Sequence, residues 1–176
     1  SVNDAPAGAD KTVTVLEDGS YTFSASDFGF SDESDSPANA LLAVVIATLP
    51  AAGTLKLDGA AVTAGQSIAV ADLGKLVYTP AANANGAGYA SFTFQVQDSG
   101  STTGGGSILD PTPKTITFNV TAPNHAPVGA SKTVTTLENS PYTLQTSDFG
   151  FTDPNDSPAN SLLAVKISSL PVPGSL

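Results

Sequence analysis

The feature that most constrains this chain is an internal repeat. Residues 3–55 align without a gap on residues 124–176, and 33 of the 53 aligned positions are identical. The phrase SDFGFSDESDSP at 26–37 returns in this alignment as SDFGFTDPNDSP. A repeat of this size indicates domains arranged in tandem. We therefore expect a complete repeat at 1–122 and the N-terminal part of a second copy, split or truncated, at 123–176.

Within the first repeat, apolar and polar residues alternate with the period of a half-buried β-strand. FTFQVQD at 92–98 and TITFNVT at 115–121 place aromatic and β-branched side chains on one face and polar side chains on the other. Gly, Pro, Asn or Asp residues bound the other expected strands, which are 12–16, 20–24, 41–48, 54–57, 67–70 and 75–79. VADLGK at 70–75 is the one segment that favours a helical turn.

Short strands at this spacing, with no convincing helix, predict an all-β chain that folds as a β-sandwich. The Trp and Cys of antibody domains are missing, so only the general architecture carries over. The Gly/Ser-rich stretch at 98–113 predicts a mobile hairpin loop. A recognition loop is the alternative, although the stretch has no aromatic residue with which to hold a ligand.

Composition excludes several classes of function. Six Lys, no Arg and sixteen acidic residues give a net charge of −10, which argues against nucleic acid and anionic membrane surfaces as partners. No apolar run approaches the length of about 18 residues that a membrane helix needs. With no Cys and one His, neither a thiol nucleophile nor a His-based triad is available, so we do not expect an enzyme. The chain starts at Ser1 without an initiator Met, and we expect an internal piece of a longer protein.

The acidic residues are clustered. Between Lys11 and Lys56 there is no basic residue, but there are six acids: Glu17, Asp18, Asp27, Asp32, Glu33 and Asp35. Two carboxylates about 4 Å apart repel by roughly 1 kcal/mol in water and about 4 kcal/mol at an effective dielectric constant of 20. If folding gathers three or four of them, a hard divalent cation is the neutralising partner we expect. Ca²⁺ takes about six to eight oxygen ligands, which Asp side chains and backbone carbonyls in loops supply.

The second copy selects among these acids. Asp32 and Asp35 recur as Asp153 and Asp156, whereas Glu33 becomes Pro154. Glu17 recurs as Glu138, and Asp18 becomes Asn139, which is still an oxygen donor. We therefore predict that Asp32 and Asp35 are essential for calcium binding and that Glu33 is dispensable.

The run LPAAGTLKLDGAAVTAGQSIAVADLGKLVYTPAANANGAGYASFTFQVQD at 49–98, preceded by VNDAP and LEDGSYTF, resembles a known family. It is similar to the cadherin-like, Ig-like tandem repeats of large RTX and biofilm-associated bacterial adhesins. The resemblance implies a Greek-key sandwich that binds Ca²⁺, at a bacterial cell surface or secreted. It also implies that Asp98 returns to the same pole of the domain as the Glu17 turn. The RTX nonapeptide itself does not occur.

The predicted calcium ligands are Asp4, Glu17, Asp18, Asp32, Asp35, Asp98, Glu138, Asp153, Asn155 and Asp156. Asp4 becomes His125 in the second copy, and we expect His125 to be exposed and idle rather than a metal ligand.

Each candidate has an ordinary structural alternative. Asp27 and Asp148 fit a turn-capping role. The aromatic residues beside them fit core packing: Phe28, Phe30, Phe149 and Phe151. For Asp32 and Asp35 the alternative is a solvated acidic loop.

Two functions follow from these patterns. The first is a structural extender, in which neighbouring repeats of one polypeptide project a terminal binding domain for cell adhesion or biofilm formation. A further inserted or completing domain after Leu176 is a second expected partner. The alternative is a ligand- or glycan-binding module of a secreted protein. That module would need exposed aromatic residues, but the chain has no Trp and four Tyr.

Overall fold

The computed structural model describes residues 2–156 and 158–170. The chain divides into two compact units, Ser1–Ala122 (unit 1) and Pro123–Leu176 (unit 2). Among the described residues, no helix is both long enough and apolar enough to cross a membrane.

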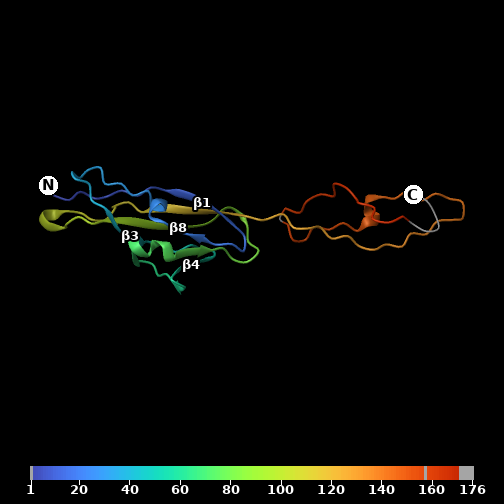
Figure 1. Cartoon of the computed structure of the whole chain (residues 1–176), viewed down its shortest axis with the longest axis horizontal. Helices are drawn as coiled ribbons and strands as arrows, with labels where there is room; N and C mark the ends of the chain where they lie inside the picture. The colour runs from blue at the N-terminus through green and yellow to red at the C-terminus, as the bar shows by residue number, and fades with distance from the viewer. Residues whose placement is uncertain (1, 157, 171–176) are drawn as a thin grey trace. The chain divides into compact units, whose positions relative to one another are not determined.

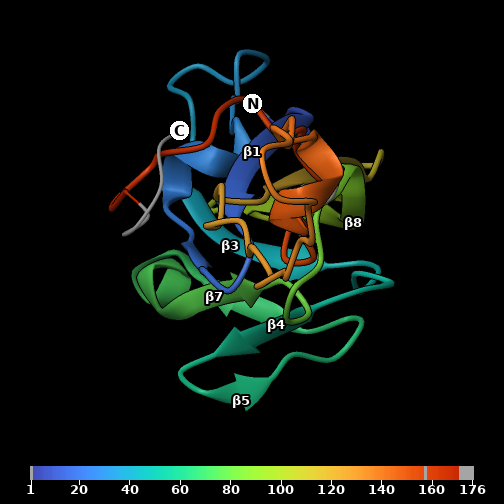
Figure 2. The same ribbon diagram turned by 90° about the vertical axis from the view of Figure 1, so that its right-hand side faces the viewer.

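Unit 1 is a sandwich of two β-sheets (Figure 1). The five-stranded sheet has the order β1 (Lys11–Leu16), β9 (Lys114–Thr121), β8 (Gly86–Asp98), β3 (Leu41–Ile46) and β6 (Ser67–Ala69). The four-stranded sheet has the order β2 (Tyr21–Thr22), β7 (Leu76–Thr79), β4 (Thr54–Leu57) and β5 (Ala60–Ala61). Figure 2 shows β7, β4 and β5 as a layer beside the sheet that holds β1, β3 and β8.

The predicted strands are confirmed in place and type, and the predicted helical turn is the 3₁₀ helix η2 (Val70–Lys75). Two further 3₁₀ helices occur in unit 1, η1 (Ala25–Phe28) and η3 (Thr103–Gly105). The two-residue strand β5 is the element of the sheets that the sequence did not predict. Two exposed alanines carry no alternation, so nothing marked it.

The core lies between the sheets and is rich in aromatic side chains. Alternate residues of β8 and β9 point into it, including Phe94 and Phe118, both fully buried. Tyr78 of β7 stacks on Phe118 with ring centroids 3.6 Å apart, which joins the two sheets. Phe28 of η1 meets Phe94 edge to face, with centroids 4.9 Å apart. Phe30 packs against the same cluster, so the predicted packing role of Phe28 and Phe30 is confirmed.

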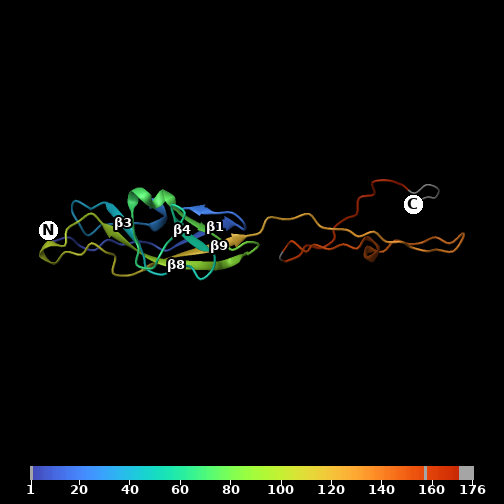
Figure 3. The same ribbon diagram turned by 90° about the horizontal axis from the view of Figure 1, so that it is seen from below.

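The strand β8 runs along the long direction of unit 1 (Figure 3). At its start, Asn85 donates a hydrogen bond to Glu17, whose own N–H donates to the carbonyl of Thr121. At its end, Asp98 accepts a hydrogen bond from the side chain of Asn3. The chain therefore enters unit 1 at one end of β8 and leaves it at the other.

Unit 2 has far less regular structure. Its described residues contain one 3₁₀ helix, η4 (Thr146–Phe149), and one isolated bridge between Val128 and Thr152, but no strand. The reason lies in the pairing of unit 1, where β1 pairs with β9, β2 with β7, and β3 with β6 and β8. All of those partners come from residues 67–121, for which the chain carries no second copy. The repeated half therefore has no strands with which to pair.

Candidate metal centre

The loop between η1 and β3 carries the first part of the site. Gly29 ends η1 in the left-handed conformation, with φ 55°, and a Cβ built there would lie 2.5 Å from that of Ala9. Only glycine makes this turn without strain. Paired backbone hydrogen bonds between Ala7 and Ser31, of 2.9 and 2.8 Å, then hold the loop against the N-terminal segment. This anchoring places Asp32 and Asp35 at one end of the sandwich.

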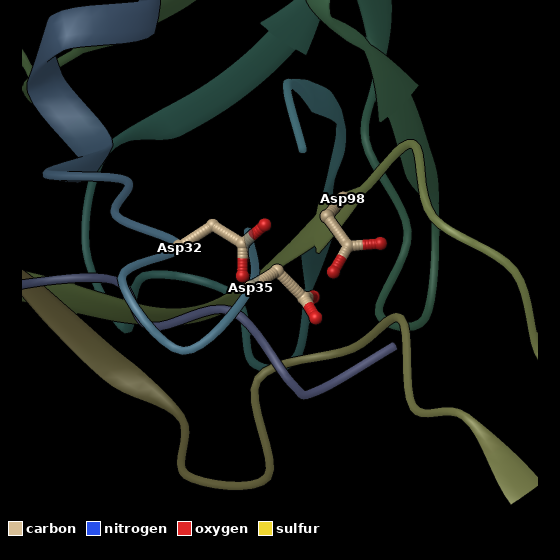
Figure 4. Close-up of side chains that lie close together, drawn as sticks. All are labelled: Asp32, Asp35 and Asp98. Carbon is tan, nitrogen blue, oxygen red and sulfur yellow. The ribbon is translucent and has the colours of Figure 1, made fainter. Parts of the chain in front are cut away.

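Asp98, the last residue of β8, meets these two side chains. Asp32, Asp35 and Asp98 each bring a carboxylate oxygen within 4.8 Å of the other two. Figure 4 shows the three carboxylates turned toward one another, two from the loop and one from the end of the strand. All three residues are buried, and Asp98 is fully so. The alternative of a solvated acidic loop does not describe this arrangement.

Hydrogen bonds account for only some of these oxygens. Oδ2 of Asp32 accepts from the backbone N–H of Asn39, but its buried Oδ1 makes no hydrogen bond to the described residues. Oδ2 of Asp35 accepts from the backbone N–H of Asp4 at 3.0 Å and from the side chain of Asn39 at 3.1 Å. A buried carboxylate oxygen without a hydrogen-bond partner is costly, and a cation beside Asp32 Oδ1 would offset that cost.

Two asparagines support the cluster. Asn39 Nδ2 donates to Asn3 Oδ1 at 2.6 Å, and Asn3 Nδ2 donates to Asp98 Oδ2 at 3.2 Å. The backbone N–H of Gly100 adds a 2.8 Å bond to Asp98 Oδ1. Gly100 lies so close to Asn3 that an added Cβ would sit 1.6 Å from Asn3 Oδ1. Asn3 and Asn39 were not among the predicted ligands, although both recur in the second copy, as Asn124 and Asn160.

Among the described residues, no cationic side chain balances the three carboxylates. Of the ion pairs among the described residues, none includes Asp32, Asp35 or Asp98. Three negative charges gathered out of water repel strongly at low dielectric. Oxygen donors, net negative charge and flexible loop geometry are the features that suit Ca²⁺, whereas Mg²⁺ demands near-ideal octahedral geometry. The residues therefore fit a calcium ion.

Unit 2 repeats most of this arrangement. Asp153 Oδ2 accepts from the backbone N–H of Asn160 at 2.7 Å, and Asp156 Oδ2 accepts from the Asn160 side chain at 2.8 Å. Asn160 also donates to Asn124 Oδ1 at 2.8 Å. Asp153 Oδ1 is buried and makes no hydrogen bond to the described residues, as with Asp32 Oδ1. The counterpart of Asp98 has no position in this sequence.

His125 differs from its expected role. Its backbone N–H and its Nδ1 both lie 2.9 Å from Oδ1 of Asp156. The prediction that His125 is idle is therefore wrong. The backbone bond matches the one that Asp4 donates to Asp35, so the two positions share a main-chain role. The side chain of Asp4 is exposed and does not join the triad.

The expected meeting of Asp98 with the Glu17 turn is wrong. Glu17 and Asp98 lie at opposite ends of β8, because the strand continues through 13 residues without reversing. Asp18 has a positive φ of 57° and accepts a hydrogen bond from the N–H of Asn83, which is a turn role. Its counterpart Asn139 has φ 58°, in the left-handed region that Asp and Asn tolerate.

Two further predicted ligands lie on the surface of unit 2. Glu138 and Asn155 are both exposed, and neither belongs to the cluster that Asp153 and Asp156 form with Asn160. Glu33, predicted to be dispensable, is exposed as well.

Asp27 does not belong to the triad and pairs with a lysine. Its Oδ2 accepts from the backbone N–H of Ser24 at 2.7 Å, which confirms the predicted turn-capping role, and Lys11 Nζ lies 2.6 Å from its Oδ1. Burial alone would raise the pKa of Asp27, but the hydrogen bonds from Lys11, Ser24 and Tyr21 together lower it. Lys132, Tyr142 and Asp148 repeat this cluster. Lys11 thus neutralises Asp27, a pairing that the sequence pattern did not indicate.

The two packed sheets, with the first strand parallel to the last, define unit 1 as an Ig-like β-sandwich. The sequence profile of the bacterial Ig domain matches residues 3–109, and the chain belongs to that family. Bacterial Ig domains are typical of surface or secreted proteins, and the family is typically non-enzymatic. Searches against curated proteins and against solved structures gave no match.

Proposed function

We propose that this chain is a calcium-stabilised structural repeat of a large bacterial surface adhesin. Tandem units of this kind would project a terminal binding domain away from the cell for adhesion or biofilm formation. The observation that carries the proposal is the buried triad of Asp32, Asp35 and Asp98, in which Asp32 Oδ1 has no hydrogen-bond partner. The same unpartnered oxygen recurs at Asp153 in unit 2.

Calcium at this site would join three separate parts of unit 1. Asp32 and Asp35 belong to the loop before β3, and Asp98 belongs to the end of β8. Asn3 connects the N-terminal segment to the same group through its bond to Asp98. A bound ion would therefore fix the end of the domain at which the chain enters, where the repeat would meet a preceding one.

The path of the chain through unit 1 supports a spacer role. Asn3 and Thr121 lie at opposite ends of β8, so a polypeptide that enters at one pole leaves at the other. A strand of 13 residues spans about 40 Å at roughly 3.3 Å per residue. Neighbouring repeats in the same polypeptide would each add about this length to a projecting array.

An extracellular location suits this chemistry. Calcium modules outside cells work at dissociation constants of about 10⁻⁴–10⁻³ M, so the ion would order the repeat only after export. We place the protein at the bacterial cell surface or among secreted proteins.

The test is a calcium titration of the purified chain, followed by calorimetry and by thermal melting. We expect one ion in unit 1 and a stabilisation of about 1.4–2.7 kcal/mol at 10–100 times the dissociation constant. That stabilisation corresponds to roughly 3–10 °C in melting temperature for a domain of this size. Magnesium at the same concentration should give a smaller shift.

Two variants make the result specific. Asp98→Asn should abolish the calcium-dependent shift, because it removes a ligand of the triad. Asp58→Asn makes the same chemical change in an exposed turn with φ 50° that Asn also tolerates, and it should leave the shift intact. A melting temperature that is identical in calcium and in excess chelator would refute the proposal.

A further inference from the structure

At the end of unit 1 where the chain leaves, the loop before β8 contacts the turn after β1. The backbone N–H of Asn83 donates to Oδ1 of Asp18 at 3.2 Å, and Nδ2 of Asn85 donates to Oε2 of Glu17 at 3.1 Å. The N–H of Glu17 donates in turn to the carbonyl of Thr121, the last residue of β9, at 2.9 Å. Two carboxylates of the turn therefore accept hydrogen bonds from the loop.

Glu17 is a buried acid that lies outside the triad. It is 7% exposed, and none of the ion pairs among the described residues includes it. A buried carboxylate needs hydrogen-bond donors to offset the loss of water. The side-chain amide of Asn85, which is half-buried, is such a donor. This contact therefore depends on residue 85 being an amide rather than an acid.

The residue after Asn85 makes that amide chemically labile. Asn85 is the one asparagine of the sequence that a glycine follows. The main-chain nitrogen after an asparagine can attack the side-chain amide carbon, and glycine hinders this attack least because it has no Cβ. Gly86 is exposed and has φ 143°, a conformation open to glycine far more than to other residues. Among the described residues, none lies within 4 Å of the position that a Cβ would take at Gly86.

We infer that Asn85 is a site of spontaneous deamidation, and that the reaction replaces its hydrogen bond to Glu17 by a contact between two carboxylates. The nitrogen of Gly86 gives up its proton and forms a bond to Cγ of Asn85. The bond from Cγ to Nδ2 breaks, and the amide nitrogen leaves as ammonia with that proton. Water then opens the resulting succinimide ring. Its hydroxyl adds to one of the two ring carbonyl carbons, and its proton returns to the nitrogen of Gly86.

The product bears a different relation to Glu17. Opening of the ring at Cγ gives aspartate, and opening at the main-chain carbonyl gives isoaspartate. Either carboxylate has no proton to donate, and it repels a carboxylate at hydrogen-bond distance. Isoaspartate also adds a carbon to the main chain immediately before β8 begins. We therefore expect the loop to separate from the turn as the protein ages.

This loosening is separate from the proposed calcium chemistry. Glu17 and Asn85 lie at one end of β8, and the triad lies at the other. The reaction involves no residue of the triad and needs only water. The inference therefore stands or falls independently of calcium binding.

The first experiment follows the chemistry in the chain of 176 residues. The purified protein is incubated in mildly alkaline buffer, the released ammonia is measured, and the tryptic peptide from Leu76 to Lys114 is fragmented in a mass spectrometer. That peptide contains both Asn83 and Asn85, so one spectrum compares them. We expect position 85 to gain a carboxylate first and Asn83, which Ala84 follows, to remain an amide. Asn85→Gln should remove most of the ammonia release. An Asn85 that stays intact, alone or while another asparagine reacts, would overturn the inference.

The second experiment tests the consequence with variants. Asn85→Asp reproduces the aspartate product and should lower the equilibrium constant for folding about tenfold, because a hydrogen bond to a charged group is lost. Glu17→Gln should recover most of that loss in a double-mutant cycle, since its side-chain amide can donate to the new carboxylate. Urea unfolding measures the constants, and hydrogen exchange at amides 83–86 locates the change.

Asn83→Asp is the matched control, because it adds the same charge to the same loop. Asn83 is exposed, its left-handed φ of 56° is one that Asp tolerates, and its bond to Asp18 comes from the main chain. Its folding constant should therefore fall less than that of Asn85→Asp. An Asn85→Asp variant as stable as the wild type, or a loss that Glu17→Gln does not relieve, would overturn the contact between carboxylates.

Discussion

The ammonium group of Lys11 lies 2.6 Å from the carboxylate of Asp27, and the pair recurs between Lys132 and Asp148. Asp27 is 4% exposed and also accepts bonds from the N–H of Ser24 and the hydroxyl of Tyr21. The cluster ties the first strand to η1, the 3₁₀ helix that positions Phe28 in the core. Asp27 therefore has a structural partner, unlike Asp32, Asp35 and Asp98, which form the triad.

Replacing Lys11 by Gln should destabilise unit 1 by about 1 kcal/mol, because Asp27 would lose one charged hydrogen bond but keep the others. The expected loss of stability is small because Lys11 is partly exposed to solvent, which screens the ion pair. Urea unfolding measures the change. Lys75→Gln, which breaks the exposed pair with Asp72, is the control and should cost less than Lys11→Gln.

The same pair predicts a dependence on pH. The folded pKa of Asp27 is lowered, so its contribution to stability is present above the unfolded value of about 3.9 and is lost as the pH falls below it. The difference in free energy of unfolding between the wild type and Lys11→Gln should therefore shrink below about pH 4. A difference that stays constant down to pH 2 would contradict this assignment.

A second pH effect comes from Tyr21. Burial, together with its bond to Asp27, raises the pKa of Tyr21 to about 12. A raised pKa means that the protonated form is favoured in the folded state, so the stabilisation is present below pH 10 and is lost as the pH rises toward 12. The alkaline unfolding profile of Tyr21→Phe, compared with that of the wild type, measures this loss. An identical alkaline unfolding profile for the two proteins would speak against it.

Asp32→Asn should have opposite effects in the two calcium states. In excess chelator it removes one of three crowded charges and should raise the melting temperature by a few degrees. In saturating calcium it should lower the melting temperature relative to the wild type, because a ligand is lost. Two melting curves per protein measure this crossover. A variant that is less stable in both states would show that Asp32 has only a packing role.

The repeat and the alternation of β8 and β9 were enough to predict the sandwich, because the period of two is a local property of the sequence. The carboxylates Asp32 and Asp35 could be selected because both recur in the second copy, which needs no knowledge of the fold. The position of Asp98 was misjudged because it depends on how far β8 extends, which residues 86–91 of the sequence do not show. The pairing of Lys11 with Asp27 was missed because it spans 16 residues and arises only when β1 packs beside η1.

The close approach of Gly100 to Asn3 predicts an effect on calcium affinity. Gly100→Ala would force Asn3 away from Asp98 and should weaken calcium binding by about tenfold, equivalent to about 1.4 kcal/mol. Calorimetric titration measures the change. Gly74→Ala is the matched control, since a Cβ there meets no atom within 4 Å, and its affinity should equal that of the wild type.

The two copies of one valine report on the packing of each unit. Val44→Ala should destabilise unit 1 by about 2 kcal/mol, because it leaves a cavity between β3 and the other sheet. Val165→Ala, the same change at the repeated position, should alter the stability of the chain by less than about 0.5 kcal/mol, because that side chain is already open to solvent. Chemical unfolding followed by far-UV circular dichroism measures both. Equal costs at the two positions would contradict this prediction, because they would mean that Val165 is packed in solution as tightly as Val44.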